Sequence, residues 1–370
     1  AMATRPQWVY QGNGVNATAP TPVWFAEQAL PMSFDRLGFY QSLRLMHGVG
    51  KRTLVNEVSR NRPLTAYVFH RDGRLDELEQ QPVHQRLDET RTVEQATDEL
   101  RDLMADVMHG LLTHPKLGER TVHLPLTAGM DSRHILAQLR RMDRAPASIR
   151  HVFVHSPEAD PVVAMTKGLG HPLHMLGLGE LDYDSLHPQW VRTTAGLIHH
   201  HQIYLMGVVP TASEVDEDNG GFIGFDGYLA DKLVGFACRH VLLDGRFYAK
   251  ATLPLLFGDS RALERSTLAE IDHEYALWDG DAKFKNGGTD AFNRGPTYTG
   301  GIFPTLTGVS GAGDVQYFAP TAHARAFEFF CTTPYAIAGK KRVRLNLFRR
   351  DFPVEGAYPA EDGKNYVERE

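Results

Sequence analysis

The sequence predicts an α/β fold, in which a parallel sheet with helices on its faces follows a smaller, partly β unit. Strand-like and helix-like segments alternate between residues 121 and 170, which is the pattern of parallel strands joined by crossover helices. The chain has 370 residues, more than one compact core usually holds, so two domains are expected. Hydrophobic residues make up 42% and charged residues 23%, as in ordinary globular proteins.

The first domain is expected over residues 1–90. Its first thirty residues are rich in Pro, Gly, Asn and Thr, which predicts an irregular or weakly extended chain. The patterns that follow predict a helix at residues 33–45, strands at 53–58 and 65–69, a hairpin turn at 71–74, and a polar linker at 80–91.

The second domain is expected over residues 91–370, and it opens with the clearest helix signal in the chain. Thr92 and Gln95 have the spacing of a capping box, and apolar residues then recur every three or four positions up to Leu111. Further patterns predict strands at 121–126, 149–154 and 222–224, helices at 132–142 and 160–170, a flexible stretch at 287–313, and mostly helices elsewhere in the last third.

The turn between the predicted strand and helix near residue 130 has the chemistry of an anion site. A helix N-terminus presents free backbone N–H groups and a partial positive charge. Ala128 and Gly129 allow the backbone to approach a ligand closely, while Thr127 and Ser132 add hydroxyl groups. Asp131 would repel a phosphate unless a Mg²⁺ ion lay between them, so the pattern favours a phosphate ligand with Mg²⁺. The alternative is an ordinary strand-to-helix turn.

This turn resembles the Ser-Gly-Gly-x-Asp-Ser pyrophosphate loop of the N-type ATP pyrophosphatases, and more narrowly their asparagine-synthetase-like branch. Thr127 stands in place of the Ser and Ala128 in place of the first Gly. The lysine of the P-loop pattern GxxxxGK[ST] is absent here. The resemblance implies an adenine-nucleotide alpha-hydrolase-like domain with helical additions, and an ATP site that includes Leu126, Thr127, Ala128, Gly129, Met130, Asp131 and Ser132.

Two later segments extend the resemblance. The segment after the strand at 149–154 is similar to the part of the family that lines the adenosine pocket, which implies that Val154 and Ser156 contact ATP. Asp160, at the start of the next helix, fits this family and equally fits a plain N-cap.

Residues 220–235 resemble the family's second glycine- and acid-rich loop. The resemblance implies that Asp231 is the second Mg²⁺ ligand, with Asp226 as the alternate, and that Gly224, Asp226 and Gly227 lie at the nucleotide. Lys232 stands where the family has a Glu, and N-capping of a helix is the alternative role for Asp231.

The ends of the chain also show a likeness to this family. Residues 33–75 resemble the closing part of a glutaminase domain, and residues 318–350 resemble the family's late helices. Such a glutaminase needs an N-terminal cysteine, whereas this sequence has no cysteine before Cys238. Residues 1–90 are therefore expected to be an inactive remnant of that domain.

A catalytic lysine is a further implication of the resemblance, because the family places one late in the chain to steady the adenylation and the tetrahedral intermediate. Lys364, on a predicted loop, is the first candidate, and Lys340 and Lys341 are the alternates. The basic run at residues 340–350 can equally be a solvated helix face.

Composition excludes several other classes of protein. The net charge of −6 argues against a protein that holds long nucleic acid, and the two distant cysteines argue against a disulfide framework or a zinc ribbon. The sequence has no apolar run of about 18 residues, so a cytoplasmic protein without a membrane partner is expected. The histidines at 199–201 are expected to have a structural or substrate-contact role rather than a zinc role.

Together these observations predict an ATP-dependent ligase of the asparagine-synthetase-like kind. It would activate a carboxylate as an acyl-adenylate, release pyrophosphate with the help of Mg²⁺, and form an amide or lactam with an amine. The expected partners are small-molecule or peptide substrates, with ammonia from a separate source as the alternative nitrogen donor. The competing predictions are an RNA-base-modifying enzyme with the same loop, and a non-catalytic nucleotide-binding scaffold.

Overall fold

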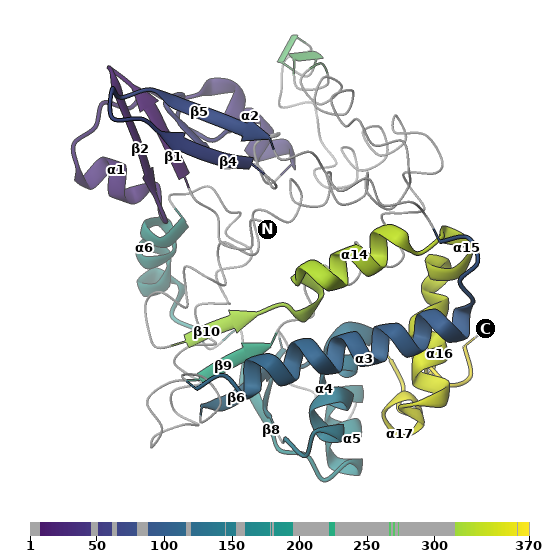
Figure 1. Cartoon of the computed structure of the whole chain (residues 1–370). Helices are drawn as coiled ribbons and strands as arrows, with labels where there is room; N and C mark the ends of the chain where they lie inside the picture. Colours follow the sequence, from purple (N-terminus) through teal and green to yellow (C-terminus); the bar gives the residue numbers. More distant parts are fainter. Residues whose placement is uncertain are drawn as a thin grey trace. The chain divides into compact units, whose positions relative to one another are not determined.

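The structure is a computed structural model of the whole chain, drawn in Figure 1. The residues that it describes are 8–45, 51–60, 65–79, 88–115, 120–144, 146–152, 160–177, 179, 181–194, 222–225, 266–267, 269–270, 273, 315–360 and 362–369.

The chain divides into two compact units. The first boundary between the units, after Gln85, lies close to the predicted domain boundary at residue 90. However, two later segments that the sequence prediction gave to the second domain group with the first unit. Unit 1 consists of Ala1–Gln85, Asp184–Gln202 and Ala237–Gly308, and unit 2 of Arg86–Tyr183, Ile203–Phe236 and Val309–Glu370.

Unit 1 begins with a β-hairpin where the sequence predicted an irregular chain. Strands β1 (Trp8–Gly12) and β2 (Val15–Ala19) are antiparallel, and β3 (Val58–Arg60) pairs with the other edge of β1. The turn between β1 and β2 is Asn13-Gly14, and both residues have positive φ, at 50° and 77°. This dipeptide is the strongest short-range hairpin signal, because its backbone twist matches that of the strands. The prediction for this stretch was therefore wrong.

The first helices of unit 1 are short. Helix α1 spans Val23–Glu27, and α2 spans Arg36–Leu45. Helix α2 starts three residues later than predicted, since Asp35 accepts a hydrogen bond from the backbone N–H of Gly38 at 2.9 Å and so acts at the helix start. The side chains of Trp8, Tyr10, Ala19, Phe25 and Val58 form the described core of this unit.

The strand predicted at residues 53–58 is mostly a turn. The Thr53 hydroxyl lies within hydrogen-bond distance of the carbonyls of both Val55 and Val58, and this local bonding competes with an extended backbone. The hairpin predicted next is confirmed, with β4 (Thr65–Phe69) and β5 (Leu75–Glu79) antiparallel around a turn. Helix α6 spans Tyr183–Thr194, most of it in unit 1.

Unit 2 is built on a sheet in which each described strand runs parallel to its neighbours (Figure 1). The order across the sheet is β10-β9-β6-β7-β8, so the chain starts at β6 in the middle, proceeds to one edge, and returns to the other side at β9. The strands are β6 (Thr121–Pro125), β7 (Ala147–Val152), β8 (Leu173–Gly177), β9 (Phe222–Phe225) and β10 (Val315–Phe318).

Helix α4 (Met130–Arg141) is the central helix of unit 2, and nearly all its residues are buried. One side packs with β6, with α5 (Pro161–Gly168) and with the end of α3 (Val93–Leu112) in the main core. Another side contributes Met130 and Ala137 to a second core shared with the C-terminal segment. The predicted capping box of α3 is confirmed, with Thr92 and Gln95 bonding each other's backbone N–H at 2.9 and 3.2 Å.

The late helices are α14 (Ala324–Thr332), α15 (Tyr335–Ala338), α16 (Arg342–Arg350) and α17 (Pro353–Gly356), with 3₁₀ turns at Pro320–Ala322 and Gly339–Lys341. Three of them, α14, α15 and α16, pack against α3, and α17 packs against α16; α16 crosses the N-terminal half of α3 (Figure 1).

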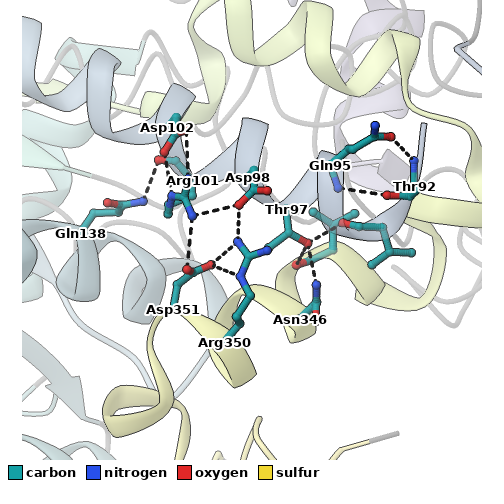
Figure 2. Close-up of polar contacts among 12 residues, drawn as sticks. Thr92, Gln95, Thr97, Asp98, Arg101, Asp102, Gln138, Asn346, Arg350 and Asp351 are labelled. Atoms are coloured by element: carbon teal, nitrogen blue, oxygen red, sulfur yellow. Dashed lines mark hydrogen bonds and ion pairs between the residues drawn. The ribbon is translucent and has the colours of Figure 1, made fainter. Parts of the chain in front are cut away.

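Polar contacts join α16 to α3, as Figure 2 shows. Arg101 of α3 reaches Asp351, and Arg350 of α16 reaches Asp98 at 2.6 Å. Deeper in the interface, Asn346 donates to the Thr97 hydroxyl at 3.1 Å. These bonds set the position of α16 along α3.

None of the helices in the described part of the chain combines the length and the apolarity needed to cross a membrane.

Candidate functional site

The loop of residues 126–129 leaves the carboxyl end of β6, the middle strand of the described sheet, and leads directly into α4. On one side of β6 the chain continues to β7, and on the other side it returns later to β9. In open parallel sheets this reversal is where ligands bind, at the carboxyl ends of the two strands. The loop that the sequence predicts to be an anion site therefore starts at the topological switch point.

Side chains along this loop alternate between the core and the surface. Leu126, Ala128 and Met130 are buried, and they belong to the two cores on either side of α4. Thr127 is exposed, and Gly129 and Asp131 are partly exposed. Of the predicted ATP-binding residues, the buried three can therefore contribute only backbone groups, whereas the side chains of Thr127 and Asp131 are accessible to a ligand.

The two predicted hydroxyl groups bond to each other rather than facing outward together. The oxygens Thr127 Oγ1 and Ser132 Oγ are 3.1 Å apart, and Ser132 Oγ also accepts from the Thr127 backbone N–H at 3.0 Å. Ser132 is buried. Its hydroxyl closes the loop, so Ser132 shapes the backbone and Thr127 is the accessible hydroxyl of the two.

The N-cap of α4 is Gly129, with an extended backbone. Glycine has no side chain that could bond the first N–H groups of the helix, as Ser, Thr or Asp would at this position. An ideal Cβ at Gly129 would lie 3.0 Å from Thr127 Oγ1. A side chain at this position would therefore crowd Thr127, whose Oγ1 accepts a hydrogen bond from the Gly129 N–H at 3.1 Å.

Asp131, in the first turn of α4, forms an ion pair with Arg344 of α16. The Asp131 side chain is 24% exposed, whereas that of Arg344 is only 2% exposed. Asp131 is the predicted metal ligand, and Arg344 belongs to the basic run at residues 340–350, for which a solvated helix face was one alternative. For Arg344 that alternative is wrong, because α16 turns this side chain into the protein.

A second buried arginine attaches the C-terminal segment to the loop. Arg133 donates to the carbonyls of Ala128 and Pro359, both at 2.9 Å, and to that of Tyr358 at 2.6 Å. The Tyr366 hydroxyl also donates to the Ala128 carbonyl, at 3.0 Å. Burial lowers the pKa of the Arg133 guanidinium and raises the pKa of the Tyr366 hydroxyl.

Sequence reasoning assigned no role to Arg133 or Tyr366, because the partners of both side chains are distant in the sequence. The available signal was the position of Arg133, four residues after the helix N-cap at Gly129, which places its side chain one turn into the helix.

The three predicted lysines differ in their setting. Lys364 is exposed on a turn between Pro359 and Asn365, two residues before Tyr366, so it belongs to the segment that bonds the loop. Lys341 is the N-cap of α16 with φ of 61°, three residues before Arg344. The side chain of Lys340 lies outside the described residues, although its backbone is in the preceding 3₁₀ turn.

The rest of the predicted site lies mainly outside the described residues. That holds for Val154, Ser156, Asp226, Gly227 and Asp231. Gly224 is buried in β9, next to β6, and Asp226 follows this strand directly in the sequence. Asp160 is the N-cap of α5 and accepts from the Val162 N–H at 2.8 Å, as its alternative role predicted.

Two histidines of unit 2, His134 within α4 and His171 after α5, are buried and neutral. Burial, assisted by the charge of Arg344, lowers the pKa of His134 to about 3. Burial, assisted by Arg140, lowers the pKa of His171 to about 4, and Ser148 Oγ lies 2.8 Å from its Nε2. Neither imidazole is protonated at neutral pH, so the positive charge near the loop comes from arginine.

Within the described residues, no three His, Cys, Asp or Glu side chains are grouped so that they could hold a metal ion. No protein-family model matches the chain, and no curated protein matches its sequence.

Proposed function

We propose that the chain is an ATP-dependent, AMP-forming ligase that activates a carboxylate for attack by an amine. The observation that supports this most is the position of Gly129 and Asp131. They form the start of a central helix, at the carboxyl end of β6, beside the point where the strand order reverses. Backbone N–H groups and a helix dipole at that place favour a phosphate chain.

The assignment to an adenine-nucleotide alpha-hydrolase-like fold is part of this proposal. Its support is the resemblance of residues 126–133 to a pyrophosphate loop, together with the parallel strand order around β6. The loop has no Walker lysine to favour transfer of the γ-phosphoryl group. We therefore expect cleavage between the α- and β-phosphates.

The loop residues fit a Mg²⁺ ion. Proteins usually hold Mg²⁺ through one or two carboxylates together with substrate phosphates. Asp131 provides a partly exposed carboxylate at the helix start, and Asp231 is the proposed second ligand. When bound, the ion would offset the negative charge that develops on the departing pyrophosphate.

In the proposed reaction the substrate carboxylate attacks the α-phosphorus of ATP, and the bond to the pyrophosphate oxygen breaks. Backbone N–H groups at the start of α4 and the exposed Thr127 side chain would orient the leaving group. An amine then attacks the acyl carbon and AMP leaves, which forms an amide or lactam. Lys364 is the proposed cation near the acyl group, since its segment is bonded to the loop through Tyr366.

A non-catalytic nucleotide-binding or scaffold role is the second candidate, and a specific observation favours it. Thr127 and Ser132 bond each other, and Asp131 is paired with Arg344, so the loop has internal partners. An RNA-base-modifying enzyme is a weaker alternative, because the chain has a net charge of −6. We propose a cytoplasmic location, where ATP is abundant and the chain's two cysteines would stay reduced.

ATP–pyrophosphate exchange tests the proposal without knowledge of the amine. The full chain is incubated with ATP, Mg²⁺, radiolabelled pyrophosphate and a panel of amino acids, small dicarboxylates and peptides. Carboxylate-dependent incorporation of label into ATP is the expected result. Binding of ATP without exchange for any member of the panel would favour the scaffold instead.

A further inference from the structure

A buried cation lies behind the first turn of α4. Arg344 has 2% of its side chain exposed, and its Nη2 pairs with Asp131 Oδ1. Its Nη1 is also buried and has no hydrogen-bond acceptor in the described part of the chain. Burial of a guanidinium is costly unless its charge is compensated. Asp131 supplies that compensation, and one end of the guanidinium still has donors to offer.

The backbone of α16 holds Arg344 firmly in this position. Thr97 Oγ1 of α3 lies 3.4 Å from the carbonyl oxygen of Val343 and accepts a hydrogen bond from Asn346 at 3.1 Å, so one side chain contacts α16 on both sides of Arg344 in the sequence. Figure 2 shows the bond between Asn346 and Thr97 beside the ion pairs of Arg350. A side chain delivered from such a fixed helix segment is preorganised for binding.

The positive charge of Arg344 offsets the negative charge of Asp131 in the loop. A carboxylate in the first turn of a helix is stabilised by the dipole, yet it repels a phosphate. Pairing with Arg344 neutralises Asp131, so the helix start keeps its positive potential. Guanidinium groups also match phosphate oxygens through parallel N–H donors.

We propose that Arg344 is a positioning residue which holds and neutralises Asp131, and which prepares the loop to accept the pyrophosphate portion of a nucleoside triphosphate. The inference rests on the proposed function and adds the residue that sets the affinity of the loop for phosphate. Arg344 donates to Asp131, and its charge acts on the loop through that carboxylate.

Calorimetric titration of the full chain with inorganic pyrophosphate, in EDTA and then in Mg²⁺, tests this inference. Arg344→Gln should weaken binding by about 30-fold or more in EDTA, because it removes the cation and leaves Asp131 to repel the anion. Arg344→Lys keeps the charge but lacks the planar fork, so a loss of about 10-fold is expected. The matched control is Arg350→Gln on the same helix, which should bind within about twofold of the wild type.

The double variant Asp131→Asn with Arg344→Gln separates this role from simple support of the fold. It removes the repulsion together with the cation, so it should bind pyrophosphate in EDTA better than Arg344→Gln alone. Melting temperatures are measured for every variant. If Arg344→Gln does not fold, Arg344→Lys and the double variant give the comparison, since both keep the charges balanced.

Pyrophosphate binding by Arg344→Lys and the double variant within about twofold of the wild type would overturn the inference. It would leave the proposed function intact, because the wild type would still bind. Failure of the wild type to bind either pyrophosphate or ATP would instead remove the proposed function, and the inference with it.

Discussion

The residues of the loop after β6 differ in what they can contribute. Every second side chain, at Leu126, Ala128 and Met130, is buried in a core, so substitution there changes packing before it changes binding. The residues between them, Thr127, Gly129 and Asp131, are open to a ligand to different degrees. Substitutions that test ligand binding should therefore be made at Thr127, Gly129 and Asp131.

Replacing Gly129 by Ala should weaken nucleotide binding by about 10-fold or more with little loss of stability. Its φ of −67° suits any residue, but the added Cβ would lie 3.0 Å from Thr127 Oγ1 and would displace the hydroxyl that is proposed to contact the phosphates. ATP affinity is measured by calorimetry and stability by thermal melting.

The control is Gly110→Ala in the exposed part of α3, where a Cβ meets nothing within 4 Å. It should stabilise the chain by about 0.5–1 kcal/mol and leave ATP affinity unchanged. Equal ATP affinities for both variants would show that the start of α4 does not approach the ligand.

Asp131→Asn should abolish pyrophosphate release and also lower stability. The rate should fall on the order of 10³-fold if the carboxylate holds the metal ion. The free energy of unfolding should fall by about 1–3 kcal/mol, because Arg344 loses its counter-charge while remaining buried. Exchange rate and denaturant unfolding are measured on the same preparation.

The matched control for Asp131→Asn is Asp102→Asn, which breaks an exposed pair with Arg101 on α3. Its effect on stability should stay within about 1 kcal/mol, and its exchange rate should equal that of the wild type. Activity of Asp131→Asn within about threefold of the wild type would show that this carboxylate is not a metal ligand.

Stability should fall on acidification between pH 6.5 and pH 4 because of His134 and His171. Their pKa values, about 3 and about 4 in the folded chain, lie below the ordinary value of 6.5. The unfolded chain therefore takes up protons in this range while the folded chain does not, and stability is fully present only above about pH 6.5. The slope reaches about 1.4 kcal/mol per pH unit for each histidine.

Urea unfolding at pH 7 and pH 5 measures this slope, with His134→Gln and His187→Gln compared. His187 is exposed on α6 and serves as the control. The slope should decrease in His134→Gln only. An unchanged slope in that variant would mean that His134 is protonated in the folded chain or accessible to water.

At the scale of elements, α3 positions α16, which brings Arg344 to the loop. The ion pairs of Arg101, Arg350 and Asp351 are still partly exposed, with side-chain exposures of 20%, 36% and 14%, so each is expected to contribute little energy. The buried contacts of Thr97 and the apolar residues of α16 contribute more of the stability. The polar network mainly fixes how the helices align.

Thr92→Ala should cost about 1 kcal/mol of stability, because it removes the capping box at the start of α3. Thr92→Ser keeps the oxygen that accepts from Gln95, so it should cost less than about half of that. Chemical unfolding measures both, and equal losses for the two variants would show that the methyl group rather than the cap is important.

Local patterns predicted the elements that local physics determines. Helix α3, with its cap and its apolar spacing, and the β4–β5 hairpin, with its turn, follow from such patterns. The β1–β2 hairpin does not follow from the composition of the first thirty residues, which favours an irregular chain, although the Asn13-Gly14 dipeptide is a local hairpin signal. Strands β8 and β10 were not predicted, since each is too short for a clear alternation.

At the scale of the whole molecule, the candidate site combines segments that are far apart in the sequence. The sequence could indicate the loop of residues 126–133, because its chemistry is local. It could not indicate that Arg133 bonds Tyr358 and Pro359, or that Arg344 faces Asp131. Such partners depend on tertiary packing, which brings α16 and the C-terminal segment to α4.

The division into two units places the described part of the loop, Arg344 and Lys364 all in unit 2. The positions of these residues relative to one another are therefore set within one compact unit. The proposed chemistry uses no described residue of unit 1.

The most direct test of the central claim is the identity of the spent nucleotide. The full chain is incubated with ATP, Mg²⁺ and a carboxylate that supports pyrophosphate exchange, and the products are followed by phosphorus NMR. AMP and pyrophosphate should appear in equal amounts, because the loop at Thr127–Ser132 favours pyrophosphate as the leaving group. ADP and orthophosphate as the main products would contradict the account.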